Sequence, residues 1–468
     1  MSQPGPSVAS PVASRMLAEI WRALDGAPAA LSSVRLAGSG ALPSVFATSD
    51  LAQASVAAAG LAVAGLLEAS GHGLPVVECD RRLASMWFSS SLRAQGWTPP
   101  ALWDSVAGDY RTVDGWIRLH TNAPHHRAAA LQVLELDAQN ASREEVGRAV
   151  ARWNGGELET AIVGNKGCAA EMRSREQWAR HPQGMAVAAE PLVARESFDA
   201  AGTRRAVLDP ARPLAGIRVL DLTRVLAGPT ATRFLAGLGA DVLRIDPVWW
   251  DEPGVVPEMT LGKRCAHLDL SAAQDRRQLE RLLAQADVLV QGYRPQALEH
   301  LGLGAARRRA LNPALVDVAL DAYGWSGPWA GRRGFDSLVQ MSSGIADAGM
   351  QLLGKDKPGP LPVQALDHAT GYLLAAAALR GLTRREQAGE GSAYRLSLAR
   401  TAQLLAAHPA QGIEPDFAAE TPDDLGAAQE DTVWGPARRL RAPLQIASVP
   451  LRWDLPASPL RSASAQWR

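Results

Sequence analysis

Residues 216–246 read GIRVLDLTRVLAGPTATRFLAGLGADVLRID, and this stretch decides the fold of the larger part of the chain. A β-branched apolar run ends at Asp221, a short loop reaches Pro229, a helical passage follows, and ADVLRI has the composition of a second strand. This order predicts a β–α–β unit. Parallel neighbouring strands need a crossover of this kind, which is right-handed in nearly all proteins.

The alternation of strands and helices continues beyond residue 246. Apolar runs at 264–270, 287–293, 315–320 and 393–398 are separated by stretches with helical patterning. Strands that alternate with helices of this length predict an α/β fold with a parallel sheet.

Changes of pattern divide the chain into six segments. Prolines in the first and last segments, and a mixture of Gly, Pro and charge between 197 and 215, mark the boundaries. The predicted segments are a disordered leader (1–30), a repeat of an aspartate-helix segment (31–100), a small α+β domain (101–196), a linker (197–215), the parallel-sheet domain (216–410) and an extended C-terminal tail (411–468).

An aspartate stands at the head of two alanine-rich helical stretches. The segment that starts at Asp50 aligns without a gap with the segment that starts at Asp367, which indicates an internal repeat. Each carboxylate can cap its helix by accepting an amide hydrogen bond, a role worth about 1 kcal/mol. Each can instead use the positive helix end to stay ionised and act as a nucleophile. The pattern by itself leaves both roles open.

Composition excludes several classes of partner. The 48 basic residues balance the 48 acidic residues, which argues against nucleic acid and against an anionic membrane surface. The three cysteines, Cys79, Cys168 and Cys265, stand far apart, which disfavours a disulfide framework and agrees with a reducing cytoplasm. Polar residues and a glycine interrupt the apolar run at 51–67, so we expect a buried helix and no membrane span.

Motifs for several chemistries are missing from the sequence. The turn after residue 221 lacks the G-x-G-x-x-G pattern, and neither a G-x-S-x-G elbow nor a Walker loop occurs. His120, His125 and His126 have no acidic or cysteine partner at a useful spacing, so packing is predicted for them and no metal site.

Basic residues stand close to the predicted strands and form three groups. Because parallel sheets bind ligands outside the carboxyl ends of their strands, these groups are predicted to surround one phosphate-bearing ligand. They are Lys263 with Arg264, Arg294, and Arg332 with Arg333.

Ordered motifs between residue 213 and about residue 405 closely resemble the N-terminal domain of family III CoA-transferases. They include PLAGIRVLDLTRVLAGP, ADVLVQGYRPQALEHLGLG, YGWSGPWAGRRGFDSLVQMSSGI and ALDHATGYLLAAAALRGL. The resemblance implies a Rossmann-like CoA-binding domain with a smaller α+β domain. It also implies no permanently bound cofactor, coenzyme A or acyl-CoA as substrate with a small carboxylic acid, and a homodimer.

The resemblance assigns roles to individual residues. Asp367 is implied to be the nucleophile, which carries CoA from the donor to the acceptor acid as an aspartyl-CoA thioester. CoA contacts are implied for Val225, Leu226, Lys263, Arg264, Tyr293 and Arg333. The sequence departs from the pattern at Pro247, Gly292 and His300, where a member of the family has an arginine, an asparagine and another arginine.

Two other functions remain open at this level. The family also contains α-methylacyl-CoA racemases, which pair the aspartate with the histidine of a GHD motif. Phe335 stands at that histidine position and accepts no proton, so transfer is favoured. A non-catalytic CoA-ester-binding homologue is the other alternative.

The N-terminal half resembles parts of the family that normally follow the aspartate, so the domain order is rearranged. Asp50 lacks a matched CoA-binding region before it and is predicted to be a cap or a relic. The repeat also leaves open a monomer in which one chain imitates part of the dimer.

Overall fold

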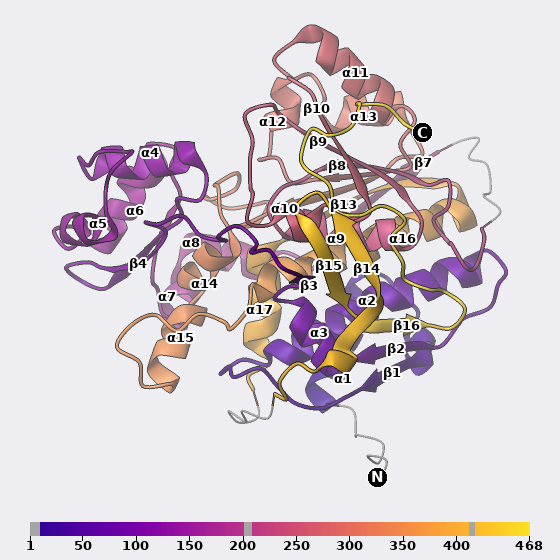
Figure 1. Cartoon of the computed structure of the whole chain (residues 1–468), viewed down its shortest axis with the longest axis horizontal. Coiled ribbons are helices and arrows are strands. Elements are labelled where there is room, and N and C mark those ends of the chain that lie inside the picture. Colours follow the sequence, from indigo (N-terminus) through magenta and orange to yellow (C-terminus); the bar gives the residue numbers. More distant parts are fainter. Residues whose placement is uncertain (1–9, 201–207, 411–416) are drawn as a thin grey trace.

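The computed structural model describes residues 10–200, 208–410 and 417–468, and its centre is a seven-stranded sheet (Figure 1). Six strands are parallel, as predicted. The edge strand β7, which was not predicted from the sequence, runs antiparallel to β13. In spatial order the strands are β10 (Lys263–His267), β9 (Asp241–Asp246), β8 (Arg218–Leu222), β11 (Val288–Gln291), β12 (Val316–Asp321), β13 (Glu390–Ser397) and β7 (Ala194–Asp199).

Helices cover both faces of this sheet, because successive side chains of a buried parallel strand point to opposite faces. Val219 faces the core shared with α9 and α16, whereas Leu220 faces the core shared with α11 and α12. The helices of this region are α9 (Ala227–Gly237), α10 (Val256–Met259), α11 (Ala273–Leu283), α12 (Ala297–His300), α13 (Ala305–Leu311), α14 (Asp336–Ser342), α15 (Ile345–Leu352), α16 (Ala365–Ala388) and α17 (Leu398–Ala407).

The repeat segment packs directly on the sheet region, and the two share one hydrophobic core. Its long helix α2 lies against α16, so the two alanine-rich helices of the repeat are neighbours. The elements of this segment are η1 (Pro28–Ser33), β1 (Val34–Ala37), α2 (Thr48–Ala69), β2 (Val77–Asp80), α3 (Arg81–Trp87) and β3 (Leu92–Ala94).

Helix α2 is long and apolar enough to cross a membrane by length and composition, and the described residues contain one such helix. Inside the protein, 94% of its apolar window is buried. The sequence expectation of a buried helix is therefore confirmed for this segment.

The predicted disordered leader is wrong over residues 11–23, which form helix α1 (Pro11–Ala23). Met16 and Ile20 are fully buried, because apolar residues recur at helical spacing and face the core beside α2. The Arg380 guanidinium lies over the Trp21 ring, 5.3 Å from its centre. Residues 1–9 lie outside the described part of the chain, as do residues 201–207 of the predicted linker.

Within residues 101–196, where a small α+β domain was predicted, the structure has a three-stranded antiparallel sheet with five helices, at the left of Figure 1. It has a hydrophobic cluster of its own around Ile117, Leu131 and Leu158. Its elements are β4 (Gly108–Arg111), β5 (Trp116–Leu119), α4 (Pro124–Val133), α5 (Arg143–Val150), α6 (Gly155–Gly164), β6 (Ala169–Glu171), α7 (Arg175–Arg180) and α8 (Pro182–Ala189).

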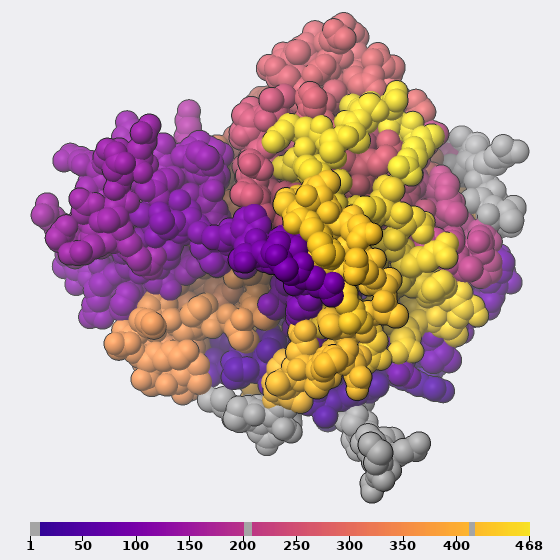
Figure 2. Space-filling view, in the orientation of Figure 1, coloured from indigo at the N-terminus to yellow at the C-terminus, as the bar shows by residue number. Residues whose placement is uncertain are grey.

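The tail crosses the surface of the other regions, where it forms the yellow band of Figure 2. Its elements are η2 (Pro422–Asp424), β14 (Leu425–Thr432), β15 (Gly435–Leu440) and β16 (Leu444–Ile446). β15 pairs with β3 and β16 pairs with β2, so strands from the tail complete two sheets of the repeat segment. Farther along, the Trp453 indole donates to the Arg233 carbonyl at 2.8 Å.

Two glycines in the paired helices test how closely α16 must approach its neighbours. A Cβ at Gly371 would lie 2.5 Å from the Ala227 carbonyl oxygen, so Gly371→Ala forces α16 away from α9. Overpacking of this kind costs about 1–3 kcal/mol of unfolding free energy. Gly65 in α2 has only the flexible end of Arg380 nearby, at 3.7 Å. Gly65→Ala should therefore stabilise the protein by about 0.5–1 kcal/mol through helix propensity.

Chemical denaturation of both variants measures the two changes in unfolding free energy. An unchanged midpoint for Gly371→Ala would show that the close approach of α16 to α9 is unnecessary.

Candidate functional site

A cavity of about 360 Å³ opens at the carboxyl edge of the parallel sheet, and Asp367 lies in its wall. Most of its lining comes from the segments that follow β8, β9, β11 and β12, which is the edge where open parallel sheets bind ligands. The lining from the sheet region includes residues 222–228, 249–250, 292–295, 320–322 and 332–335. Asp367, the nucleophile that the resemblance implies, therefore lies at the edge where ligands bind.

The side chain of Asp336 caps the start of α16. Its Oδ2 accepts the N–H groups of Leu366, at 2.8 Å, and Asp367, at 3.0 Å, and the Gln340 amide donates to its other oxygen. These bonds satisfy two of the free amides at the start of the helix, as an N-cap side chain does. The Asp367 carboxylate makes no capping bond to its own helix, so the cap role that the sequence left open for it is wrong.

The Asp367 carboxyl group has an unusual electrostatic environment. Burial, and then the charge of Asp336, raise its pKa well above the ordinary value of an aspartate. Burial also raises the pKa of Asp336, to about 6, against the opposing effect of its three hydrogen-bond donors. The expectation that a positive helix end keeps Asp367 ionised is therefore wrong in direction, because the amides of the first turn point to Asp336.

Asp50 occupies the equivalent position in α2 but is neutralised. The Arg81 guanidinium donates to both of its carboxylate oxygens, at 2.8 and 2.9 Å, and the Ser10 hydroxyl donates to one of them. The α2 helix has no side-chain cap bond either, so Asp50 is not a cap. Its carboxylate serves a buried ion pair.

One residue distinguishes the two copies. Arg81 is the first residue of α3, directly after β2, and Leu398 is the first residue of α17, directly after β13. Leu398 lines the cavity with Asp367. The structure thus places a leucine where the other copy has the arginine that binds its aspartate, and the Asp367 carboxyl group has no cationic partner among the residues that the structure describes.

The loop before α9 is held in a strained conformation beside Asp367. Val225 has a φ of 65°, in the left-handed region that a β-branched residue rarely adopts, at a cost of roughly 1–3 kcal/mol. Its N–H donates to Glu252 Oε2 at 2.9 Å, and the Trp250 indole donates to the same oxygen at 3.0 Å. Glu252 thereby fixes the backbone of Val225. Val225 and Leu226, for which the resemblance implies CoA contacts, both line the cavity.

Two of the cavity's arginines have no acidic partner among the described residues. Arg294 follows β11 and Arg333 follows β12, and the nearby charge of Arg294, after desolvation, lowers the pKa of Arg333. Arg332, in contrast, has an acidic partner, because it binds Glu159 at 2.9 Å, and it stacks on Trp329. Unpaired guanidinium groups at a cavity suit phosphate or carboxylate ligands. Tyr293, also predicted, lines the same cavity.

The predicted placement of Lys263 and Arg264 is wrong. Both residues begin β10 and so stand at the amino end of a parallel strand, away from the cavity edge. Lys263 is buried, and its ammonium group donates to Asp221 Oδ2 and to the Pro229 carbonyl, each at 3.0 Å. Arg264 binds both oxygens of Asp241. Lys263 therefore supports the first turn of α9 from inside.

The cavity also contains residues that sequence reasoning did not assign to it. His125 and His126 begin α4 of the small α+β region and line the cavity, as do Trp249 and Trp250 after β9. Burial lowers the pKa of His126 to about 3. The described residues contain no cluster of three or more His, Cys, Asp or Glu side chains that could hold a metal ion. Trp249 and Trp250, adjacent in sequence after a strand of the parallel sheet, were the pattern from which this part of the cavity wall could have been predicted.

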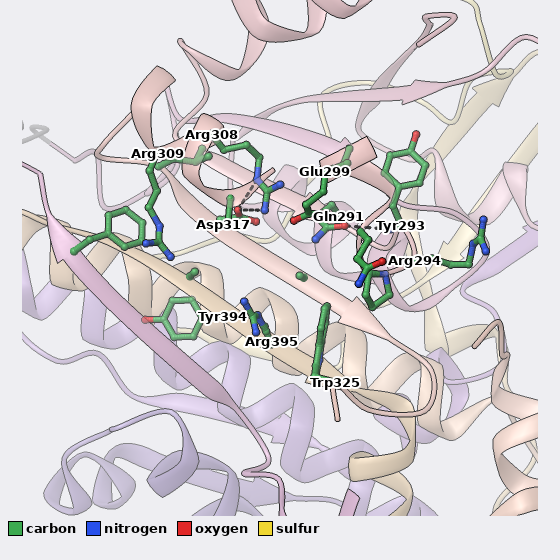
Figure 3. A pocket seen from close by; sticks show the side chains of 18 residues that line it. Gln291, Tyr293, Arg294, Glu299, Arg308, Arg309, Asp317, Trp325, Tyr394 and Arg395 are labelled. Carbon is green, nitrogen blue, oxygen red and sulfur yellow. Dashed lines mark hydrogen bonds and ion pairs between the residues drawn. The ribbon is translucent and has the colours of Figure 1, made fainter. Parts of the chain in front are cut away.

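A second cavity of about 270 Å³ lies next to the first, and the two share Tyr293, Arg294 and Pro295 as lining residues. Figure 3 shows Arg308 bound to Asp317 in this second cavity, through contacts of 2.7 Å. Trp325 lies beside Arg395 there, whose guanidinium is 5.4 Å from the ring centre. Asp317 is thus engaged, in contrast to Asp367.

Comparison with known proteins agrees with this arrangement of sheet and aspartate. The model of the family described as CoA-transferase family III matches residues 214–433. This region is similar to CoA-transferase family III. The match starts close to β8 and includes the sheet strands from β8 to β13, Asp367 and the start of the tail.

Individual relatives match the same part of the chain. A probable fatty acyl-CoA transferase of Mycobacterium tuberculosis is 36% identical over 204 residues, which cover 41% of this chain and 51% of that protein. The mouse succinyl-CoA:glutarate CoA-transferase is 33% identical over 198 residues, covering 39% and 44%. The chain therefore spans about half the length of these curated family III relatives.

Solved structures also align with only part of the chain. A crystal structure of the mycobacterial protein aligns with 32% identity and a TM-score of 0.37, covering 42% of this chain and 59% of that one. A CAIB/BAIF family protein from Brucella suis aligns with 25% identity and a TM-score of 0.37, covering 48% and 65%.

Removing the charge of Asp367 should stabilise the folded protein near neutral pH. The unfolded aspartate ionises near its ordinary pKa, whereas the folded one keeps its proton to higher pH, so wild-type stability falls as pH rises between the two. Asp367→Asn avoids this loss and should unfold at a higher midpoint than wild type at about pH 7, with a difference that shrinks towards about pH 4.

Asp50→Asn is the matched control, because Asp50 has the same helix position but a cationic partner. It should lower the unfolding free energy at about pH 7 by roughly 3–5 kcal/mol, since it leaves Arg81 buried without its counter-charge. Thermal unfolding of both variants at several pH values makes the comparison. Equal destabilisation by the two substitutions would contradict the unpaired state of Asp367.

Proposed function

We propose that the protein is a CoA-transferase that moves CoA from an acyl-CoA donor to a carboxylic acid acceptor through an aspartyl-CoA thioester on Asp367. One observation carries the proposal: Asp367 stands at the head of α16 with no cation on its carboxyl group, in a cavity at the carboxyl edge of the sheet. The similarity of residues 214–433 to CoA-transferase family III supports the reaction class. A buried, unpaired carboxylate is also the more reactive nucleophile once ionised.

The reaction is a series of acyl transfers that conserve charge. A carboxylate oxygen of Asp367 attacks the thioester carbon, the C–S bond breaks, and CoA thiolate leaves a mixed anhydride. The thiolate then attacks the Asp367 carbonyl carbon and releases the donor acid, which leaves the aspartyl-CoA thioester. The acceptor carboxylate then attacks the aspartyl-CoA thioester, which gives a second mixed anhydride and releases CoA thiolate. The thiolate attacks the carbonyl carbon of the acceptor, which yields the new acyl-CoA and regenerates the Asp367 carboxylate. Covalent catalysis divides one difficult exchange into easier steps.

The oxyanions of this series need hydrogen-bond donors in the cavity. The amides of Leu366 and Asp367 donate to Asp336 and are not available. Ala227 and Gly228, in the first turn of α9, line the cavity, and this helix start has no capping side chain. We assign oxyanion stabilisation to these two amides, in place of the start of α16.

The CoA contacts follow from the same geometry. Val225, Leu226 and Tyr293 provide the backbone and aromatic walls, and Arg333, with Arg294, faces the phosphates or the acid. Lys263 and Arg264 contribute from a distance, because Lys263 holds Asp221 and the Pro229 carbonyl beneath the first turn of α9. Coenzyme A is a substrate in this scheme, and no permanently bound cofactor takes part.

A second candidate is proton exchange at the α-carbon of an acyl-CoA. His126 lines the same cavity as Asp367, so an imidazole is present although Phe335 replaces the histidine of the motif. Burial lowers the pKa of His126 to about 3, which makes it a weak base and places this reaction second. Exchange of the α-proton into deuterated water that is lost in both His126→Gln and Asp367→Asn would establish it.

The assembly and location of the protein stay proposals. We propose a homodimer in the cytoplasm, and the three described cysteines are buried and unpaired, as in a reducing compartment. Light scattering on the full chain decides between a dimer and a monomer. A monomer would favour the alternative in which the repeat imitates part of the dimer, because one chain supplies the sheet and small-region walls of the cavity.

Asp367→Asn should abolish transfer, whereas Asp50→Asn should retain it. The first substitution removes the attacking oxygen's charge and should lower the rate of CoA exchange by at least about a thousandfold. The measurement is exchange of labelled acids into acyl-CoA esters over a broad donor panel, with hydroxylamine trapping and mass spectrometry to locate the modified residue. Labelling at another residue, or none with any donor, would overturn the proposal and favour a non-catalytic CoA-ester-binding protein.

Leu398→Arg should give Asp367 the same kind of ion pair that Asp50 has, and so inhibit transfer. An arginine at this position reproduces the ion pair that Arg81 makes with Asp50, so it should bind the Asp367 carboxylate and slow exchange by about a hundredfold or more. The variant should also lose the fall in stability between about pH 4 and pH 7, because the paired aspartate ionises early. Full activity in a folded Leu398→Arg protein would show that the missing cation is unimportant.

A further inference from the structure

We infer that a pocket beside the Asp367 cavity holds the acyl group of the substrate, and that it selects apolar monocarboxylic acids over dicarboxylic acids. The inference rests on the proposed transfer through Asp367. The pocket has a volume of about 240 Å³ and lies between the small α+β region and the segment after β9. Val225, Trp250 and Phe335 line both spaces, so the pocket adjoins the cavity that contains Asp367.

The lining of this pocket is mostly apolar and has no basic side chain. Leu102, Trp103 and Val255 join the three shared residues. Phe335 stacks on His120 with the ring centres 3.7 Å apart, and burial lowers the pKa of His120 well below its usual range. His120 is therefore neutral and adds to the flat apolar wall. An acyl chain or aromatic ring gains free energy when it leaves water for such a surface.

The charged groups of the pocket are all acidic. They are Asp104, Asp251 and Glu252, and the cations that bind two of them reach in from outside the pocket. Arg127 binds Asp104 at 2.8 Å, and Arg244 binds Glu252 at 2.5 Å. A second carboxylate on the acyl group would meet acidic oxygens and no lining cation, so its desolvation would stay uncompensated. The pocket thus disfavours succinyl and glutaryl groups.

The experiment compares hexanoyl-CoA and phenylacetyl-CoA with succinyl-CoA and glutaryl-CoA on the full chain. Calorimetric binding to Asp367→Asn requires no turnover, and CoA exchange by the wild type measures kcat/KM for each donor. The apolar donors should exceed the dicarboxylic donors by about tenfold or more in both measurements. Equal values for the two classes, or a preference for succinyl-CoA, would overturn the inference.

Leu102→Arg supplies the missing cation, and Leu352→Arg is its matched control. Both leucines are exposed, at 60% and 67%, so neither substitution threatens the core, and only Leu102 lines the pocket. Leu102→Arg should reduce the preference for apolar donors by about tenfold, since it pairs with a second carboxylate. Leu352→Arg should leave the preference unchanged. If Leu102→Arg left the preference for apolar donors unaltered, the acyl group would not bind in this pocket, and the inference would be wrong.

The two measurements separate this inference from the proposed function. Selective binding of apolar esters without exchange of any donor would support the inferred acyl pocket and contradict the proposed transferase activity. Exchange through Asp367 with equal use of dicarboxylic donors would sustain the transferase and overturn the pocket.

Discussion

Two backbone N–H groups at the start of α16 donate to one buried carboxylate, that of Asp336, and the site depends on this arrangement. Every helix start has free amides that need an acceptor. If Asp367 supplied that acceptor, its oxygens would point back along its own helix. Because Asp336 supplies it from α14, the Asp367 carboxyl group is left to line the cavity, where burial and the charge of Asp336 favour its protonated form. In the proposed transfer, a proton must therefore leave Asp367 before the group can attack a thioester.

In the repeat, one residue separates a paired aspartate from the aspartate that we propose as the nucleophile. α2 and α16 lie side by side, and each carries an aspartate as the third residue of the helix. In one copy an arginine follows the next strand, and the carboxylate becomes part of a buried ion pair. In the other copy a leucine stands there, and the carboxyl group remains unpaired. The reactive state thus costs stability that the ion pair would otherwise recover.

Much of the fold was predictable because hydrophobic periodicity records secondary structure directly. The strand and helix series from residue 216 onward and the repeat follow from it. The expected roles of Asp367, Val225 and Tyr293 came instead from the resemblance to family III CoA-transferases, and all three residues line the cavity. Helix α1 was missed because prolines around a short apolar pattern resemble a leader. Lys263 was misplaced because a residue near a strand looks the same in sequence whether it begins or ends that strand. The walls from His126 and Trp250 depend on how the small region packs against the sheet, which no local pattern records.

The strand pairings of the tail have a consequence for synthesis. β2 and β3 are made early, but their partners β16 and β15 are separated from them by most of the chain. Until the tail is synthesised, β2 pairs only with β1 and β3 lacks its partner strand, and such unpaired edges recruit other extended segments. Closing contacts over so long a separation is also slow. Because β15 and β16 follow the sheet region in the chain, they are synthesised after it, and the two sheets that contain β2 and β3 are completed only then.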